Sequence, residues 1–140
     1  MIKITKETSV STDDVLHLYQ TVGWTNYTNQ PQMLSQALSH SLATYLARDG
    51  EEIVGLVRLI GDGFSSVFVQ DLIVLPTYQR QGIGSTLMKQ ALSDYKDTYQ
   101  IQLATEESEK TLGFYRSLGF ETLSSFQCTG MILVDRKKLQ

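Results

Sequence analysis

The strongest constraint on the fold is a junction in mid-chain, where an apolar run meets a glycine loop and then a helical pattern. Residues 66–76 read "SVFVQDLIVLP", a near-continuous apolar run that predicts a strand buried on both faces. "TYQRQGIG" follows, and Ile83, Leu87, Ala91 and Tyr95 then recur at steps of four, which predicts an amphipathic helix. A helix start leaves backbone N–H groups unpaired at the positive end of its dipole, and glycines allow a close approach to them. The junction therefore predicts an anion cradle for a phosphate or pyrophosphate; the simpler alternative is a tight turn that uses glycine for packing.

The rest of the chain predicts strands and helices in a mixed order. Two helical patterns follow the short strand "IKIT", and a hairpin is expected around "DG" at residues 49–50. After the glycine loop and its helix, "TYQIQLATE" reads as a strand and "SEKTLGFYRSLG" as a helix, and "FETLSSFQCTGMILVDRK" reads as two final strands. The order β-α-α-β-β-β-α-β-α-β-β predicts a mixed α/β (α+β) layer fold. No repeat or linker divides the sequence, so we expect a single domain over residues 1–140.

Composition limits the function classes. Hydrophobic residues make up 41% of the chain and charged residues 19%, which predicts a folded globular protein. The net charge of -3 disfavours a nucleic-acid partner, and no apolar stretch is long enough to span a bilayer, so we expect a cytoplasmic protein without a membrane partner. The single cysteine, Cys128, excludes an intrachain disulfide and a cysteine-based metal cluster, and no metal site is expected.

Two motifs carry a family resemblance. In "DLIVLPTYQRQGIGSTLM", Gln79, Gly82 and Gly84 fit the pattern Arg/Gln-x-x-Gly-x-Gly/Ala of the GCN5-related N-acetyltransferases (GNAT). Further on, "LGFYRSLGF" resembles the same family's second landmark, a helix with a tyrosine followed by x-x-x-Gly-Phe. With the order of elements, the resemblance covers nearly the whole chain. It implies the GNAT architecture, a central and mostly antiparallel sheet flanked by helices.

The resemblance also implies the cofactor and how it is held. It implies acetyl-coenzyme A (acetyl-CoA) as cosubstrate, with the pyrophosphate on loop amides and the pantetheine arm paired with the edge of the preceding strand. The implied contact residues are Leu72, Ile73, Val74, Gln79, Arg80, Gln81, Gly82, Ile83, Gly84, Ser85 and, where relatives often carry asparagine, Ser108. The implied reaction is direct attack of a small molecule's primary amine on the thioester.

Acetyl transfer needs a base for the amine and an acid for the departing thiolate. The resemblance assigns the acid role to Tyr115. The alternative is that Tyr115 only packs against the sheet. For the base, period-two alternation places Asp71 on one face with Val67, Val69 and Ile73, and a carboxylate on an apolar face is a better proton acceptor because it loses water. A structural role for Asp71, with its carboxylate satisfied by an arginine or by backbone N–H groups, is an equally strong interpretation. Other candidates for the base are Glu106, Glu107 and a chain of waters.

The acceptor site is less specified. In this fold the first two helices and their loop usually cover the acceptor, so Trp24 and Tyr27 are expected to line it, or else to pack the helices on the sheet. The same aromatic loop, the glycine motif and a late "GM" also resemble small bacterial and plant-type relatives of arylalkylamine acetyltransferases. The alternatives are a non-catalytic acyl-CoA-binding module and an acetyltransferase of aminoacyl-tRNA, the latter disfavoured by the acidic balance. Both a monomer and a homodimer fit the sequence.

Overall fold

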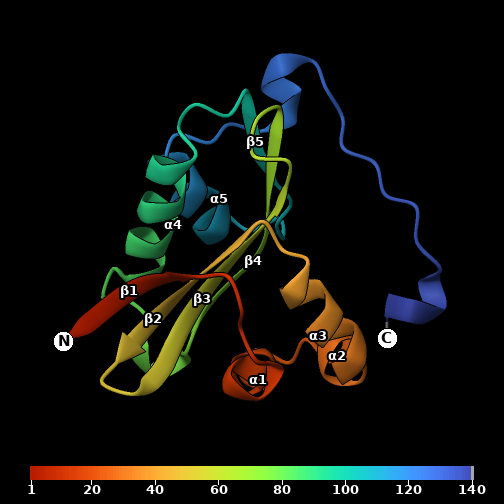
Figure 1. The fold of residues 1–140 in the computed structure, drawn as a ribbon. Coiled ribbons are helices and arrows are strands. Elements are labelled where there is room, and N and C mark those ends of the chain that lie inside the picture. The colour runs from red at the N-terminus through yellow and green to blue at the C-terminus, as the bar shows by residue number, and fades with distance from the viewer. Residues whose placement is uncertain (140) are drawn as a thin grey trace. The chain divides into compact units, whose positions relative to one another are not determined.

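The computed structural model describes residues 1–139, which form two compact units, Met1–Ala104 and the chain from Thr105 onward (Figure 1). The first unit is built on a five-stranded sheet in the order β1-β2-β3-β4-β5. Its strands are β1 (Ile2–Glu7), β2 (Ala43–Asp49), β3 (Glu52–Gly61), β4 (Ser66–Val74) and β5 (Gln100–Leu103). Neighbouring strands are antiparallel except for β4 and β5, which are parallel. The predicted mixed α+β fold with a mostly antiparallel sheet is confirmed.

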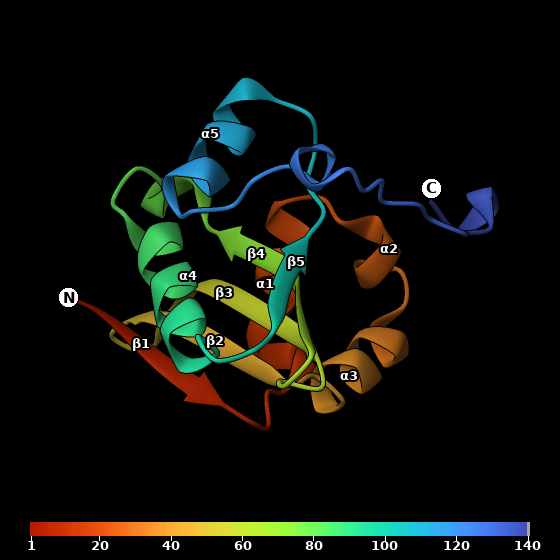
Figure 2. The same cartoon turned by 90° about the horizontal axis from the view of Figure 1, so that it is seen from above.

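Helices cover both faces of this sheet. On one face α4 (Ile83–Asp94) packs against β1 to β4 (Figure 2). Leu87 of α4 lies over Gly55, where a Cβ atom would meet its side chain at 3.2 Å. On the other face α1 (Thr12–Thr21) packs against β3 and β4. A single-turn helix α2 (Thr25–Thr28), absent from the expected order, and α3 (Pro31–Ser39) continue from α1. No helix in the described part of the chain is long and apolar enough to cross a membrane.

The second unit contains the helix α5 (Glu109–Ser117) and two 3-10 turns, Leu123–Phe126 and Arg136–Leu139. The two final strands predicted from residues 120–137 are not present among the described residues. A strand requires a neighbour for its backbone groups, and within this unit residues 129–134 join no backbone hydrogen bond. The prediction of two final strands is therefore wrong for the described residues, because an apolar pattern alone does not supply the neighbouring backbone that a strand needs.

Candidate functional site

The glycine loop directly follows β4 and opens α4. A short 3-10 turn at Pro76–Tyr78 leads to Arg80 and Gly82, whose φ angles of 66° and 79° are both left-handed. In the described chain the backbone N–H groups of Ile83, Gly84 and Ser85 donate to no protein acceptor. Free amides at the start of a 12-residue helix, with no acidic side chain in its first turn, form a ready binding site for an anion.

The side chains of the loop divide into exposed and anchoring ones. Residues 79–82 are exposed, whereas Ile83 is buried in the core and offers only its backbone amide. Gln79 anchors the loop, because its Nε2 donates to the backbone carbonyl of Val74 at 3.1 Å. A Cβ atom at Gly82 would meet no atom within 4 Å, so glycine serves here for its backbone conformation and leaves the amides open.

The strand before the loop has an open edge. β5 pairs with β4 only from Ser66 to Val69, so residues 70–74 of β4 have a strand neighbour on the β3 side alone. This stretch contains Leu72, Ile73 and Val74, of which Ile73 is buried and the other two are half-buried. Apart from the Val74 carbonyl, which accepts from Gln79 Nε2, this edge offers unpaired backbone groups to an extended ligand with amide groups, and the glycine loop follows it along the chain.

A β-bulge sets the direction of Asp71. Arg58 of β3 lies opposite Asp71, but the next residue, Leu59, lies opposite Val69, so Gln70 is an extra residue in β4. Arg58 and Leu59 are neighbours in β3 and point to opposite faces of the sheet, and directly opposed residues share a face. The expectation that Asp71 shares a face with Val67 and Val69 is therefore wrong, because the bulge breaks the alternation between them.

Asp71 lies in a buried polar group that we call the tyrosine–arginine cluster, formed by Tyr19, Tyr27, Arg58 and Asp71. Arg58 Nε donates to Asp71 Oδ2 at 2.7 Å, and the hydroxyl groups of Tyr19 and Tyr27 donate to Oδ2 and Oδ1 at 2.9 Å and 3.0 Å. Arg58 also donates through Nη2 to Tyr27 Oη at 3.0 Å. All four residues are at most 7% exposed. Both carboxylate oxygens are thus engaged, and the charge of Asp71 is balanced by Arg58.

The protonation of the cluster follows from burial and from this ion pair. Burial and the neighbouring Asp71 carboxylate raise the pKa of Tyr19 and of Tyr27, so both phenols stay protonated and act as donors. Burial opposes the charge of Arg58, but the attraction of Asp71 outweighs it and raises the pKa of the guanidinium. The cluster is a satisfied network rather than a site with a free acceptor.

Sequence reasoning missed Arg58 and Tyr19 as partners of Asp71. The signal for Arg58 was present, because it is the one charged residue inside the apolar run "IVGLVRLI". A charge on such a strand needs a buried partner of opposite sign. Tyr19 gave no separate signal, since an aromatic residue on the apolar stripe of a helix reads as ordinary core.

The two aromatic residues expected at the acceptor site differ in burial and in contacts. Tyr27 is 7% exposed, and its ring and hydroxyl are both used by the tyrosine–arginine cluster. Trp24 is half-buried at the start of α2, with its ring centroid 6.1 Å from that of Tyr19 and 6.4 Å from that of Tyr27. Trp24 therefore covers the cluster and keeps part of its indole accessible.

In the second unit, Tyr115 lies within α5 between two aromatic rings. Its ring packs edge-on against Phe114 and Phe120, with centroids 5.0 Å and 5.9 Å away. Burial raises the pKa of Tyr115, and its hydroxyl makes no hydrogen bond to a residue of its own unit.

Ser108 caps the same helix, because its Oγ accepts from Thr111 N at 3.1 Å. The Ser108 hydroxyl donates to Thr111 Oγ1 at 2.8 Å, so it is already occupied.

The two glutamates that are the other side-chain candidates for a base follow one another in the second unit, and the two histidines of the chain lie in the first. Glu106 and Glu107 are exposed, and Glu106 accepts from Thr111 Oγ1 at 3.2 Å. His17 Nε2 lies 2.8 Å from the backbone carbonyl of Ile53, and His40 Nδ1 lies 2.8 Å from that of Gln36. Both histidine rings thus lie within hydrogen-bond distance of a backbone carbonyl, that of His17 on β3 and that of His40 on α3.

Comparison with known proteins gives a consistent picture. The model of the acetyltransferase (GNAT) domain family matches residues 8–137. The structure of a GNAT family acetyltransferase from Streptococcus pneumoniae TIGR4 is 68% identical, with a TM-score of 0.90 over 97% of this chain and 99% of that one. A GNAT family acetyltransferase from Elizabethkingia anophelis, solved with acetyl-CoA bound, shares the fold at 24% identity and a TM-score of 0.64, over 86% of this chain and 76% of that one.

Curated relatives match over shorter stretches. The rice (Oryza sativa subsp. japonica) protein named serotonin N-acetyltransferase 2, chloroplastic, is 30% identical over 95 residues, which are 65% of this chain and 48% of that protein. The Arabidopsis thaliana protein named GCN5-related N-acetyltransferase 1, chloroplastic, is 33% identical over 67 residues, 48% of this chain and 34% of that protein. The matches thus span half or less of the length of these two relatives.

Proposed function

The chain belongs to the GNAT acetyltransferase family, and from that premise we propose that it transfers the acetyl group of acetyl-CoA to the primary amine of a small molecule. The observation that carries this proposal is the unpaired amides of residues 83–85, which directly follow the open edge of β4. An anion site and an extended amide-pairing edge, in that order along one ligand, fit the pyrophosphate and the pantetheine arm of coenzyme A.

The loop holds the pyrophosphate through backbone groups. Its oxygens accept from the amides at the start of α4, where the helix dipole favours negative charge. The pantetheine amides pair with β4 in the stretch from Leu72 to Val74. The E. anophelis neighbour was solved with acetyl-CoA and a Thermoplasma acidophilum neighbour with coenzyme A, which supports this cosubstrate for the shared fold.

The reaction is direct acyl transfer. The amine nitrogen attacks the thioester carbonyl, the tetrahedral intermediate collapses, and the C–S bond breaks to release the thiolate of coenzyme A. Tyr115 is the proposed proton donor to that sulfur. Its raised pKa keeps the phenol protonated at neutral pH, and its hydroxyl is not used within its own unit.

For Asp71 we propose the structural role. A general base needs a free lone pair that faces the amine, and both oxygens of Asp71 already accept hydrogen bonds from Arg58, Tyr19 and Tyr27. The carboxylate then fixes the two tyrosines beneath Trp24, and the amine proton leaves through a chain of waters.

The acceptor is a primary amine with an aromatic portion that packs on Trp24. The accessible part of the indole offers an apolar wall, and a cation over its face adds attraction while the amine is charged. The printed name of the rice relative, a serotonin N-acetyltransferase, supports this class. Trp24→Ala should raise the acceptor KM about tenfold, whereas His40→Ala, on the exposed end of α3, should leave it unchanged.

Two measurements on the same protein separate the enzyme from a binding module. Calorimetry with acetyl-CoA measures binding, and release of free coenzyme A over a panel of aryl-alkylamines, polyamines, amino acids and aminoglycosides measures turnover. We expect binding together with release that is fastest for an aryl-alkylamine. Binding without release on any amine would leave a non-catalytic acyl-CoA module, and a preference for a hydrophilic polycation would overturn the acceptor class.

A further inference from the structure

The turn between β4 and α4 holds an unfavourable backbone conformation. Arg80 and Gly82 both have left-handed φ angles, and such an angle is unfavourable for a residue with a Cβ atom, so Arg80 keeps it only where contacts on both sides hold the chain. On the side of α4, the Thr86 N–H and Oγ1 both donate to the Gly82 carbonyl, at 2.9 Å and 2.8 Å. The side of β4 needs an anchor of its own.

Tyr78, two residues before Arg80, supplies this anchor. Its hydroxyl donates to Asp49 Oδ2 at 2.7 Å and has a longer contact with Glu52 Oε1 at 3.4 Å. Within residues 1–104, no other side chain of residues 76–82 makes a hydrogen bond beyond β4 and the turn itself. Tyr78 therefore connects the turn to a different part of the sheet, the hairpin of β2 and β3.

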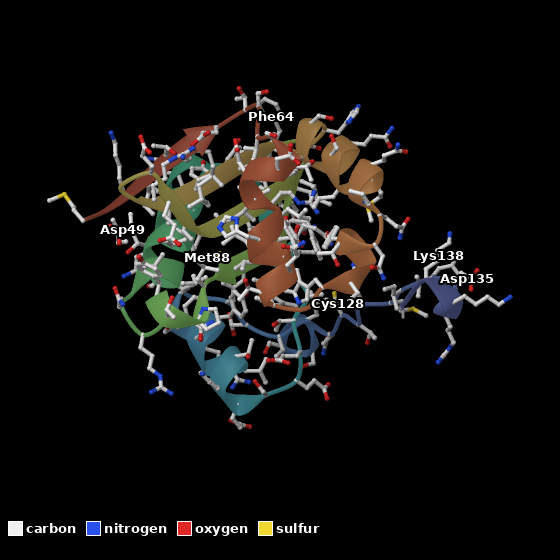
Figure 3. The ribbon with its side chains drawn as sticks, turned by 90° about the horizontal axis from the view of Figure 1, so that it is seen from below. Asp49, Phe64, Met88, Cys128, Asp135 and Lys138 are labelled. Atoms are coloured by element: carbon white, nitrogen blue, oxygen red, sulfur yellow. The ribbon has the colours of Figure 1, made fainter. Side chains whose placement is uncertain are left out.

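Asp49 is a well-fixed partner for this bond. It ends β2 at the hairpin turn (Figure 3), and its backbone lies between Ile2 of β1 and Glu52 of β3. The bond to Asp49 raises the pKa of Tyr78 to about 12, and the bond from Tyr78 lowers the pKa of the Asp49 carboxyl. At neutral pH a protonated phenol thus donates to an ionised carboxylate, which is the stronger kind of hydrogen bond.

We propose that Tyr78 is a positioning residue for the cofactor: its bond to Asp49 ties the turn to the β2–β3 hairpin and holds the glycine loop in the conformation that binds pyrophosphate. This inference rests on the proposed function, in which the amides at the start of α4 donate to the pyrophosphate of acetyl-CoA. Without the tie, the loop spends less time in the binding conformation, and the apparent affinity falls by the same fraction.

Tyr78→Phe removes the hydroxyl and keeps the ring. By calorimetry the Kd for acetyl-CoA should rise about fivefold, because the loop is then in place for about a fifth of the time. The KM for acetyl-CoA should rise by the same factor, with kcat and the KM for an aryl-alkylamine unchanged, because the bound cofactor itself holds the loop. Thr77→Val, which removes an exposed hydroxyl from the same turn, should bind like the wild type. Wild-type affinity in Tyr78→Phe, or a lower kcat with an unchanged KM for acetyl-CoA, would overturn the proposal.

A mutant cycle tests whether Tyr78 acts through the hairpin. Because Glu52 is a second acceptor, the hairpin variant combines Asp49→Ala with Glu52→Ala. Tyr78→Phe should have no further effect on the acetyl-CoA affinity in this background, and a comparison within one background cancels the change in charge. Glu51→Ala, an exposed acid in the same hairpin turn, serves as the control background, where the full loss should remain. An equal effect of Tyr78→Phe in both backgrounds would contradict the tie.

Nuclear magnetic resonance relaxation of the ligand-free proteins tests the positioning without activity. The backbone order parameters of residues 79–82 should be lower in Tyr78→Phe than in the wild type and in Thr77→Val, and unchanged values would overturn the tie. Calorimetry on the wild type separates this inference from the function on which it rests. A wild type that does not bind acetyl-CoA would remove both, whereas a binding wild type beside Tyr78→Phe of equal affinity would remove only the role of Tyr78.

Discussion

At the scale of single residues, the chemistry divides between a buried carboxylate with every oxygen engaged and a phenol without a partner in its own unit. Asp71 has three donors, Arg58, Tyr19 and Tyr27, and is 3% exposed. Tyr115 has aromatic neighbours and a raised pKa. The first arrangement suits a residue that positions its neighbours, and the second suits a proton donor.

Asp71→Asn should therefore act on stability. The change leaves Arg58 as an uncompensated buried charge, which should lower the free energy of unfolding by about 3–5 kcal/mol. Chemical denaturation measures this loss, and Asp13→Asn on the exposed surface of α1 serves as the control. The folded fraction of Asp71→Asn should keep the acidic limb of the kcat/KM profile. A shifted limb with unchanged stability would make Asp71 the general base.

Tyr115→Phe should act on the chemical step. Loss of a general acid should lower kcat by about 10²–10⁴-fold and leave the acetyl-CoA affinity unchanged. Because only the protonated phenol donates and its pKa is raised above the usual value near 10, wild-type kcat should decline only above that pH, and the variant should lose this limb. The control is Tyr99→Phe, on an exposed tyrosine outside α5. A variant with wild-type kcat at every pH would make Tyr115 a packing residue.

At the scale of elements, local patterns predicted strands, helices and the glycine loop well, and failed where a register or a partner decides the outcome. The apolar run of β4 identified the strand, but the extra residue at Gln70 depends on pairing with β3 and turns Asp71 to the other face. The apolar run near residue 131 predicted a strand, and none is present there among the described residues, because a strand depends on a partner that the run itself does not specify. Helix α2 is a single turn, too short for periodicity to show.

The turn between β3 and β4 gives an element-scale prediction for pH. The Ser65 hydroxyl and the backbone N–H groups of residues 64–66 donate to Asp62 and lower the pKa of its carboxyl. A lowered folded-state pKa contributes stability above the unfolded value near 3.9, and this contribution is lost as pH falls through the folded value. Asp62→Asn should therefore lower Tm at pH 7, and the gap to the wild type should shrink below about pH 4.

Thermal unfolding at pH 7 and pH 3 measures that gap. Glu51→Gln, an exposed substitution in the preceding hairpin turn, should show no gap at either pH. A gap for Asp62→Asn that is the same at both pH values would mean that the turn does not depend on the carboxylate.

At the scale of the whole molecule, the account rests on one unit with an anion loop and an open edge of β4, and on a second unit with the proposed acid. Residues 1–104 contain the glycine loop, and residues from 105 onward contain Tyr115. The net charge of -3 is compatible with a cationic amine but does not select one. The proposed acceptor class therefore rests on Trp24, and the proposed binding of acetyl-CoA rests on the glycine loop.

Calorimetric titration of acetyl-CoA into the wild type, Gly82→Val and Gly23→Val tests the loop most directly. Gly82 and Gly23 have similar positive φ angles, 79° and 73°, and open space where a Cβ atom would stand, so valine strains both sites about equally. We predict at least about a tenfold loss of acetyl-CoA affinity for Gly82→Val, because the loop amides lose their alignment with the pyrophosphate, and wild-type affinity for Gly23→Val. Wild-type affinity in folded Gly82→Val would contradict cofactor binding by the glycine loop.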